Sequence, residues 1–208
     1  MSVFRFLTHP QVRIDGEIPV PLWGLNDVGR ARAALISQLP WISNTTRLVS
    51  SAETKAIETA AVVACATGLA IEVREQLHEN DRSATGFVPP VRFEELADAF
   101  FAHPTDSIEG WETARAAQQR VCRATADLLT VDEEERQGED RGDSAGDILV
   151  IAHGAVGTLL LCDLLGIAIS RTHDQIGNGA ATGGGNYWAY DRRTRSVLHR
   201  WRAIESPH

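Results

Sequence analysis

Two histidines, His9 and His153, each follow a short apolar run of the kind that forms a buried strand. His9 ends the run in residues 3–10 (VFRFLTHP), and His153 ends the run in residues 147–154 (DILVIAHG). In an open α/β sheet, ligands bind in the crevice outside the carboxyl ends of the strands. A lone histidine at a strand end is more often structural. Two of them at strand-to-helix junctions, brought from distant parts of the chain, predict one site where chemistry takes place.

The elements that must position these histidines alternate between strands and helices. We expect strands at 3–8, 47–50, 71–73 and 148–152, helices at 26–39, 52–67, 91–101 and 113–129, and a terminal hairpin of strands 187–190 and 197–203. Gly68 is expected to end the second helix. Apolar runs such as 148–152 are typical of strands covered on both faces. This order predicts a three-layer α/β/α sandwich with a mostly parallel central sheet.

The chain has the length of one domain, which we expect to span residues 1–208. Residues 78–112 contain three prolines, and they predict a small cap-like insertion over the edge of the sheet. Residues 131–147 are charged and contain glycine without hydrophobic periodicity, which favours a mobile acidic loop. We expect no catalytic role for that loop.

The amino-acid composition argues against several classes of function. The net charge of −8 argues against binding to nucleic acid or to an anionic membrane. No apolar run is long enough to span a bilayer, and no secretory signal is evident, so a cytoplasmic protein is expected. The three cysteines are scattered and indicate neither disulfides nor a metal site. No His, Asp or Glu cluster has metal-ligand spacing, so we expect neither metal nor other cofactor.

Taken in order along the chain, these residues resemble the histidine phosphatase superfamily, the phosphoglycerate mutase-like group. The resemblance is carried by His9, by residues 50–60 (SSAETKAIETA), by Glu79 and by His153-Gly154. Supporting matches are Gly29-Arg30-Ala31, Gly110-Trp111-Glu112 ahead of Arg120, and Asn178-Gly179. The resemblance covers nearly the whole chain, and it implies the same α/β/α fold.

The resemblance implies a phosphohistidine mechanism. A neutral imidazole, His9, would attack phosphorus, and a carboxylic acid, Glu79, would protonate the departing alkoxide; Glu75 and Asp81 are nearby alternatives for the acid. Imidazole is a good nucleophile at neutral pH. Phosphoryl transfer also needs positive charge around the equatorial oxygens, which a protonated His153 would supply.

The expected phosphate site departs from the family pattern beside the nucleophile. The family signature is Arg-His-Gly, whereas this chain has Thr8-His9-Pro10, so a hydroxyl replaces the arginine that grips phosphate. Lys55, the only lysine of the chain, stands where the family has a second arginine, and it lacks the bidentate fork. Thr8, Ser51 and Lys55 are therefore the expected phosphate ligands, together with Arg82 as a replacement donor. Arg13 is a weaker candidate for that replacement.

Two functions remain open from the sequence. The leading one is a metal-independent phosphomonoester hydrolase that acts on a small phosphorylated substrate, with mutase activity less favoured. The rival is a weakened phosphatase-like domain that binds a phosphorylated ligand or a protein, and the Thr8 and Pro10 substitutions support it. An unrelated α/β hydrolase is disfavoured because the chain has no Gly-x-Ser-x-Gly elbow. The terminal hairpin could offer an edge for a homodimer.

Overall fold

One sheet organises the part of the chain that the structure describes. The computed structural model describes residues 2–138, 146–175 and 180–206, with the backbone alone at 131–138. The strands are β1 (Val3–Thr8), β2 (Thr45–Ser51), β3 (Ile71–Arg74), β4 (Asp147–Ala152), β5 (Asn186–Asp191) and β6 (Ser196–Ala203), in the order β3-β2-β4-β1-β5-β6. Strands β3, β2, β4 and β1 run parallel to one another, and β5 pairs antiparallel with both β1 and β6.

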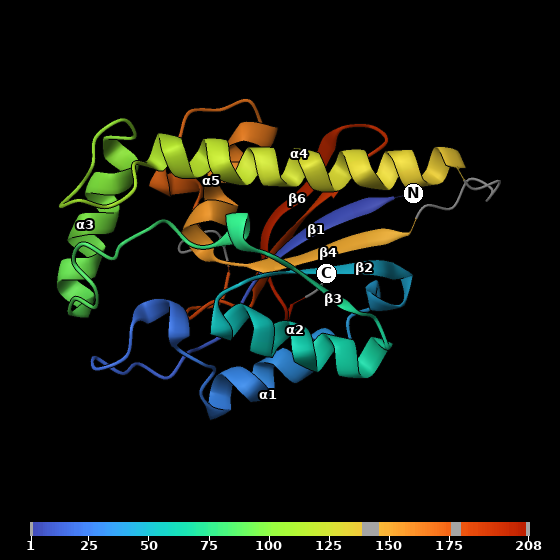
Figure 1. The fold of residues 1–208 in the computed structure, drawn as a ribbon, viewed down its shortest axis with the longest axis horizontal. Coiled ribbons are helices and arrows are strands. Elements are labelled where there is room, and N and C mark those ends of the chain that lie inside the picture. The colour runs from blue at the N-terminus through green and yellow to red at the C-terminus, as the bar shows by residue number, and fades with distance from the viewer. Residues whose placement is uncertain (1, 139–145, 176–179, 207–208) are drawn as a thin grey trace.

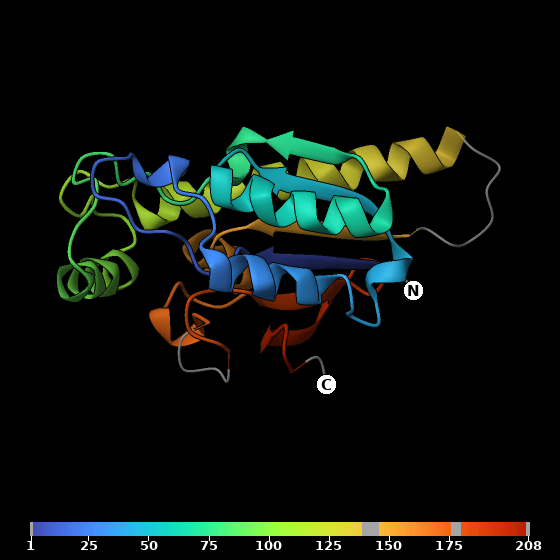
Figure 2. The ribbon, with the colours of Figure 1, turned by 90° about the horizontal axis from the view of Figure 1, so that it is seen from below.

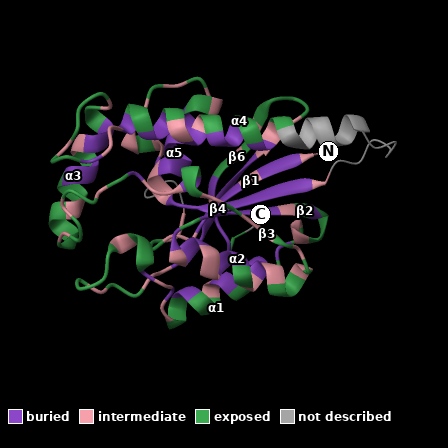
Figure 3. Cartoon of the chain, in the orientation of Figure 1, coloured by how far each residue is buried: buried purple, intermediate pink, exposed green. Residues whose placement is uncertain are grey.

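Helices cover both faces of this sheet, which confirms the predicted three-layer sandwich. Helices α1 (Asp27–Ile36) and α2 (Thr54–Thr67) lie on one face, and α4 (Ala114–Gly138) and α5 (Gly154–Leu164) lie on the other (Figures 1 and 2). All six residues of β4 are buried, as Figure 3 shows for the centre of the sheet. A strand enclosed on both faces needs apolar side chains on both, which explains the unbroken run of β4.

Local signals set the helix ends near the predicted residues. The Asn26 side chain accepts a hydrogen bond from the Gly29 N–H at 2.8 Å and caps α1. Gly68 takes a left-handed conformation with φ 75° directly after α2, which an L side chain would resist. By contrast, His153 provides no side-chain cap to α5. The group that serves this end comes from elsewhere in the chain and belongs to the site.

Helix α3 (Pro90–Ala102) belongs to the segment predicted to form a cap. It lies beyond the carboxyl ends of β1 and β4 (Figure 1). Its side chains Phe93, Ala97, Phe100 and Phe101 line a cavity together with His9. The segment therefore contributes a wall to the region in which the two histidines were expected.

The predicted mobile loop at 131–147 is wrong at both ends. Helix α4 continues to Gly138, because residues 131–138 (VDEEERQG) are mostly strong helix formers despite their lack of apolar periodicity. Strand β4 begins at Asp147, whose carboxylate accepts a hydrogen bond from the Val3 N–H at 2.8 Å and pairs with Arg5. Residues 139–145 lie outside the described residues.

The two terminal strands form the predicted hairpin at one edge of the sheet. The outer strand β6 alternates exposed and half-buried residues along most of its length. The possible homodimer through this edge stays a prediction. Within the described residues, no helix is both long enough and apolar enough to cross a membrane.

Candidate active site

The fold brings His9 and His153 together at the carboxyl edge of the sheet. Their strands, β1 and β4, are parallel neighbours, with Thr8 opposite Ala152 in the register. The next residue of each strand is therefore a histidine. The two ring centroids lie 5.2 Å apart, and the rings meet edge to face at 66°. The sequence prediction of two imidazoles in one place thus agrees with the structure.

The backbone of His9 is held by the sheet on one side and by a glycine-rich turn on the other. The His9 N–H donates to the Ala152 carbonyl at 3.0 Å, and the Gly185 N–H donates to the His9 carbonyl at 3.1 Å. A Cβ on Gly184 would lie 2.0 Å from the His9 carbonyl oxygen, and the φ of Gly184 is 81°. Only glycine fits this close approach. The turn at 183–185 therefore fixes the position of His9.

The His9 ring is prepared as a neutral nucleophile. Its Nδ1 lies 2.8 Å from the Pro10 carbonyl oxygen, which can only accept, so Nδ1 carries the proton and Nε2 keeps its lone pair. Burial lowers the pKa of His9 to about 4, and the positive charge of Lys55 adds to this shift. At neutral pH the imidazole is therefore uncharged.

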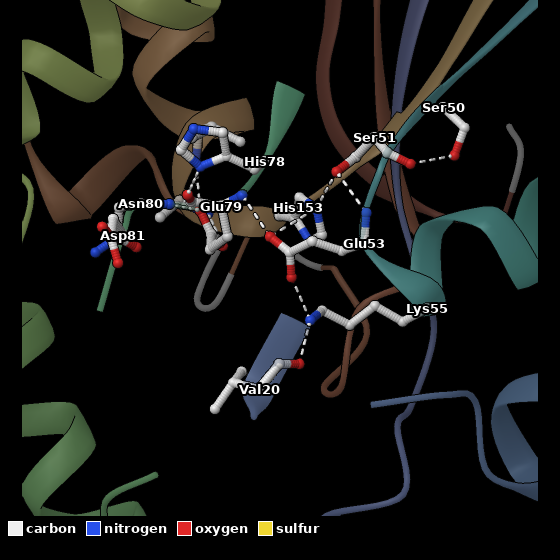
Figure 4. A network of polar contacts seen from close by, with 12 residues as sticks. Val20, Ser50, Ser51, Glu53, Lys55, His78, Glu79, Asn80, Asp81 and His153 are labelled. Carbon is white, nitrogen blue, oxygen red and sulfur yellow. Dashed lines mark hydrogen bonds and ion pairs between the residues drawn. The ribbon is translucent and has the colours of Figure 1, made fainter. Parts of the chain in front are cut away.

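A second group of polar side chains, the enclosed cluster, consists of Ser51, Glu53, Lys55 and His153 (Figure 4). All four are buried, and the exposed fraction of His153 is 0%. His153 Nε2 lies 2.8 Å from Ser51 Oγ and 3.4 Å from Glu53 Oε1. Both partners thus approach the same ring nitrogen. A Ser-His-acid triad needs the acid on the other nitrogen, so this cluster does not form one.

Burial opposes the protonated state that the sequence predicts for His153. Burial lowers the pKa of His153 well below its ordinary value, although the Glu53 carboxylate opposes this shift. Its Nδ1 has no hydrogen-bond partner among the described residues. Its burial outweighs the single carboxylate beside it.

Glu53 is the main electrostatic feature of the enclosed cluster. Its carboxylate pairs with Lys55 through Oε2, and its Oε1 accepts from the Glu79 N–H at 2.8 Å. Burial favours the neutral carboxyl, but His153, Lys55 and the Glu79 N–H outweigh it and hold the pKa of Glu53 at about 2. The Lys55 ammonium also donates to the Val20 carbonyl at 2.9 Å. The lysine expected to hold phosphate is therefore already neutralised by a carboxylate.

Glu79 closes the amino terminus of α5. Its Oε2 accepts from the Ala155 N–H and its Oε1 from the Val156 N–H, each at 3.1 Å. Burial nevertheless raises the pKa of Glu79, and the negative charge of Glu53 adds to this shift. Arg120 steadies this segment, because it donates to the His78 carbonyl at 2.9 Å and pairs with Glu112. Glu79 is thus a fixed carboxyl group with a raised proton affinity.

Arg82 extends from the cap segment toward the same place. Its guanidinium carbon lies 5.0 Å from the ring centroid of Phe93 and 5.7 Å from that of Trp111. Among the described residues, its guanidinium forms no ion pair or hydrogen bond. The nearby positive charge of Arg82 lowers the pKa of both His9 and Glu79. It is therefore a cation held by aromatic faces and still able to bind an anion.

A cavity of about 500 Å³ is lined by His9, Glu79 and Arg82, together with aromatic residues of the cap. A second cavity, of about 700 Å³, lies on the other side of Glu79 and Arg82 and is also lined by Glu53 and residues 16–21. The expected proton donor and the expected anion ligand, together with Asn80, therefore line both cavities.

Thr8 lines the cavity with His9, but its hydroxyl is engaged within the protein, whereas Arg13 lies outside both cavities. The Thr8 hydroxyl accepts from the Asn186 N–H at 3.1 Å and lies 3.2 Å from Gln175 Oε1 and 3.3 Å from the Asn186 carbonyl. Its single proton is therefore used within the protein. Arg13 is 78% exposed and lies 3.8 Å from Asp15, outside both cavities.

Sequence reasoning missed Glu53 and Gln175. An acidic residue before a helix is usually an ordinary N-terminal residue, so the position of Glu53 gave no sign that its side chain would reach Lys55 and His153. Gln175 has no motif around it, although the structure places its side chain at the cavity that contains His9. Within the described residues, no group of three or more His, Cys, Asp or Glu side chains could hold a metal ion.

Similar folds occur in solved phosphatases. A mycobacterial glucosyl-3-phosphoglycerate phosphatase in complex with inorganic phosphate has a TM-score of 0.70 and 22% identity, over 97% of this chain and 95% of that one. The α-ribazole phosphatase of Shigella flexneri has a TM-score of 0.64 and 19% identity, over 99% and 96% of the two chains. At these identities the likeness establishes the fold alone. No curated protein sequence matches the chain.

A match to a family sequence model shows which family the chain belongs to. The sequence model of the histidine phosphatase superfamily (branch 1) matches residues 11–196, which is most of the chain. The match begins two residues after His9, so it does not depend on the Thr8-His9-Pro10 segment. With the matching fold and the two histidines at the carboxyl edge of the sheet, this chain belongs to the histidine phosphatase superfamily, branch 1.

Proposed function

We propose that the protein is a metal-independent phosphomonoester hydrolase that acts through a phosphohistidine on His9. The observation that carries this proposal is the state of the His9 ring, whose pKa is about 4 and whose Nδ1 faces the Pro10 carbonyl. Together these features leave the Nε2 lone pair free at neutral pH, beside a cavity that also contains Glu79. A nucleophile and a proton donor side by side are what phosphomonoester hydrolysis through a covalent intermediate requires.

The proposed reaction has two steps. His9 Nε2 forms a bond to phosphorus while the ester P–O bond breaks, and Glu79 gives its proton to the leaving alkoxide. Water then attacks the phosphohistidine, Glu79 accepts a proton from that water, and the N–P bond breaks to release phosphate. The raised pKa of Glu79 favours the protonated form needed at the start. Arg82 supplies positive charge to the phosphoryl oxygens, which phosphoryl transfer requires.

A second function, the binding of a phosphorylated ligand without turnover, is supported by one observation. Glu53 neutralises Lys55, and the Thr8 hydroxyl is engaged within the protein. Ser51 Oγ likewise contacts His153 Nε2, so three of the four expected phosphate ligands are engaged within the protein. A site of this kind would bind phosphate weakly and could have lost its chemistry. The presence of both His9 and Glu79 at the cavity favours the hydrolase.

Hydrolysis of a panel of phosphomonoesters, with a chelator present, separates the two functions. We expect turnover by the wild-type protein and none by His9→Ala, while His103→Ala, an exposed histidine at the end of α3, retains full activity. Rapid quenching under alkaline conditions should trap a phosphorylated wild-type protein and no phosphorylated His9→Ala. Equal rates for wild type and His9→Ala would contradict the hydrolase. No turnover, with phosphate still bound, would favour the binding function.

A further inference from the structure

The side-chain amide of Gln175 is held in one orientation by a chain of hydrogen bonds. The Ala181 N–H donates to Asn186 Oδ1 at 2.8 Å, which identifies the other side of the Asn186 amide as Nδ2. That Nδ2 donates to Gln175 Oε1 at 2.8 Å. The Thr8 hydroxyl lies 3.2 Å from the same oxygen. A backbone N–H thus determines the orientation of both amides, since each oxygen faces a donor.

This orientation places Gln175 Nε2 beside Gly154, the residue that follows His153. A Cβ built on Gly154 would lie 2.4 Å from Nε2, so the amide nitrogen occupies the space next to the residue that follows His153. Gln175, Gly154 and His9 line the same cavity. Among the described residues, Nε2 itself has no hydrogen-bond partner. The absence of a side chain at Gly154 therefore makes room for the Gln175 amide nitrogen at the wall of the cavity.

The backbone of Gln175 is fixed as well. Its N–H donates to Asp174 Oδ1 at 2.7 Å, and the same oxygen accepts from the Thr158 hydroxyl on α5 at 3.0 Å. Both ends of the residue are thus anchored, one to α5 and the other to the start of β5. A donor held in this way loses little conformational entropy when it binds a ligand. This is the arrangement of a binding group rather than of a surface glutamine.

We propose that Gln175 is a phosphate-binding residue, and that its Nε2 donates to a phosphoryl oxygen beside His9. The inference rests on the proposed function, because the phosphoryl group is the ligand. It also assigns a role to Thr8. With the arginine of the family pattern absent, the Thr8 hydroxyl holds the Gln175 oxygen, and the amide nitrogen donates in place of a guanidinium. A neutral donor replaces a charged one at the site of the missing arginine.

The test measures binding of inorganic phosphate by calorimetry to the full-length protein and to Gln175→Glu. The substituted carboxylate keeps the oxygen that Asn186 and Thr8 contact, and it replaces only the donating nitrogen. We expect phosphate affinity to fall by at least about tenfold, because a hydrogen bond to an anion is lost and a like charge is added. The KM for a phosphomonoester should rise by a similar factor with a smaller change in kcat.

The matched control is Gln11→Glu. Gln11 lines the same cavity, but its Nε2 already donates to the Thr182 carbonyl at 3.3 Å, and its Oε1 accepts from Arg32. The Gln11→Glu substitution therefore adds the same negative charge to the cavity without removing a free hydrogen-bond donor. Equal losses in the two variants, or unchanged affinity in Gln175→Glu, would overturn the inference, as would a wild type that binds no phosphate. Failure of the hydrolase proposal is a separate result, namely no His9-dependent turnover while phosphate binding still depends on Gln175.

Discussion

The enclosed cluster and the open side of the site, formed by His9, Glu79 and Arg82, handle charge in opposite ways. In the enclosed cluster, Glu53 is ionised with a pKa of about 2 and is paired with Lys55. On the open side, burial raises the pKa of Glu79, and Arg82 has no carboxylate partner among the described residues. One hydrogen bond links the two residues, from the backbone N–H of Glu79 to Glu53 Oε1.

The difference shows that burial decides the state of a carboxyl group unless several favourable partners act against it together. At Glu53, His153, Lys55 and a backbone N–H together outweigh burial, whereas at Glu79 burial and the Glu53 charge outweigh Arg82 and the backbone N–H groups. Two carboxyl groups whose environments push their pKa values apart are suited to different tasks. Glu53 is suited to structure, and Glu79 to the transfer of a proton.

The largest effect is expected from removal of the proton donor. Glu79→Gln keeps an oxygen near α5 but cannot give a proton, so kcat should fall by about 10²–10⁴-fold for an alkyl phosphate. The loss should be much smaller for an aryl phosphate with an acidic phenol, which departs without protonation. Steady-state kinetics on both esters, with the exposed Glu75→Gln as control, measures this. Equal losses on both esters would rule out Glu79 as the acid.

In the enclosed cluster, Glu53→Gln should make the folded protein less stable. Removing one partner of a buried ion pair leaves Lys55 uncompensated, which should lower the free energy of unfolding by about 3 kcal/mol. Phosphate should restore part of this loss, because the freed ammonium can bind the anion and ligand binding stabilises the folded state. Urea unfolding with and without phosphate tests both effects.

The control for that experiment is Glu95→Gln. Glu95 is 59% exposed and pairs with Arg92, so its loss should cost less than about 1 kcal/mol. If Glu53→Gln proved as stable as this control and bound phosphate no better than wild type, the opposition between the two sides of the site would be wrong.

Arg82→Ala should weaken binding without a comparable loss of stability. Its guanidinium touches aromatic faces, and within the described part of the chain it has no ion-pair partner to leave uncompensated. A charge-assisted hydrogen bond is worth about 1.5–3 kcal/mol, which predicts a loss of roughly 10- to 100-fold in affinity for vanadate. Arg92→Ala, an exposed and paired arginine of the same cap, should leave the affinity unchanged. Unchanged inhibition by vanadate in Arg82→Ala would exclude Arg82 as a phosphate ligand.

The smallest effect is expected in the pH dependence of kcat/KM. His9 must be neutral to attack, so activity should rise as the pH increases through its pKa of about 4. Glu79 must carry a proton, so activity should decline as the pH passes its own pKa, which is raised above the usual value. Glu79→Gln should lose the alkaline decline and keep the acid limb. An alkaline decline that persists in Glu79→Gln would assign it to another group.

Most of the fold could be predicted because its signals are local. A few neighbouring residues are enough to predict each element or its end. Examples are the apolar runs of β1 and β4, the helix cap Asn26 and the helix-terminating Gly68. The prediction failed at 131–138, where the residues lack apolar periodicity but have strong helix propensity. In that stretch propensity, rather than hydrophobic patterning, determines the structure.

The sequence by itself determined that His9 and His153 would meet, because parallel strands end at one edge and each strand is followed by a histidine. It also determined the family pattern and its departure at Thr8-His9-Pro10. Only the tertiary structure decided the charges of the site. Glu53 reaches Lys55 and His153, Glu79 reaches the amino terminus of α5, and Gln175 reaches Thr8 across 167 residues of chain. Such contacts depend on three-dimensional distances and on exclusion of water, and the spacing of residues along the chain predicts neither.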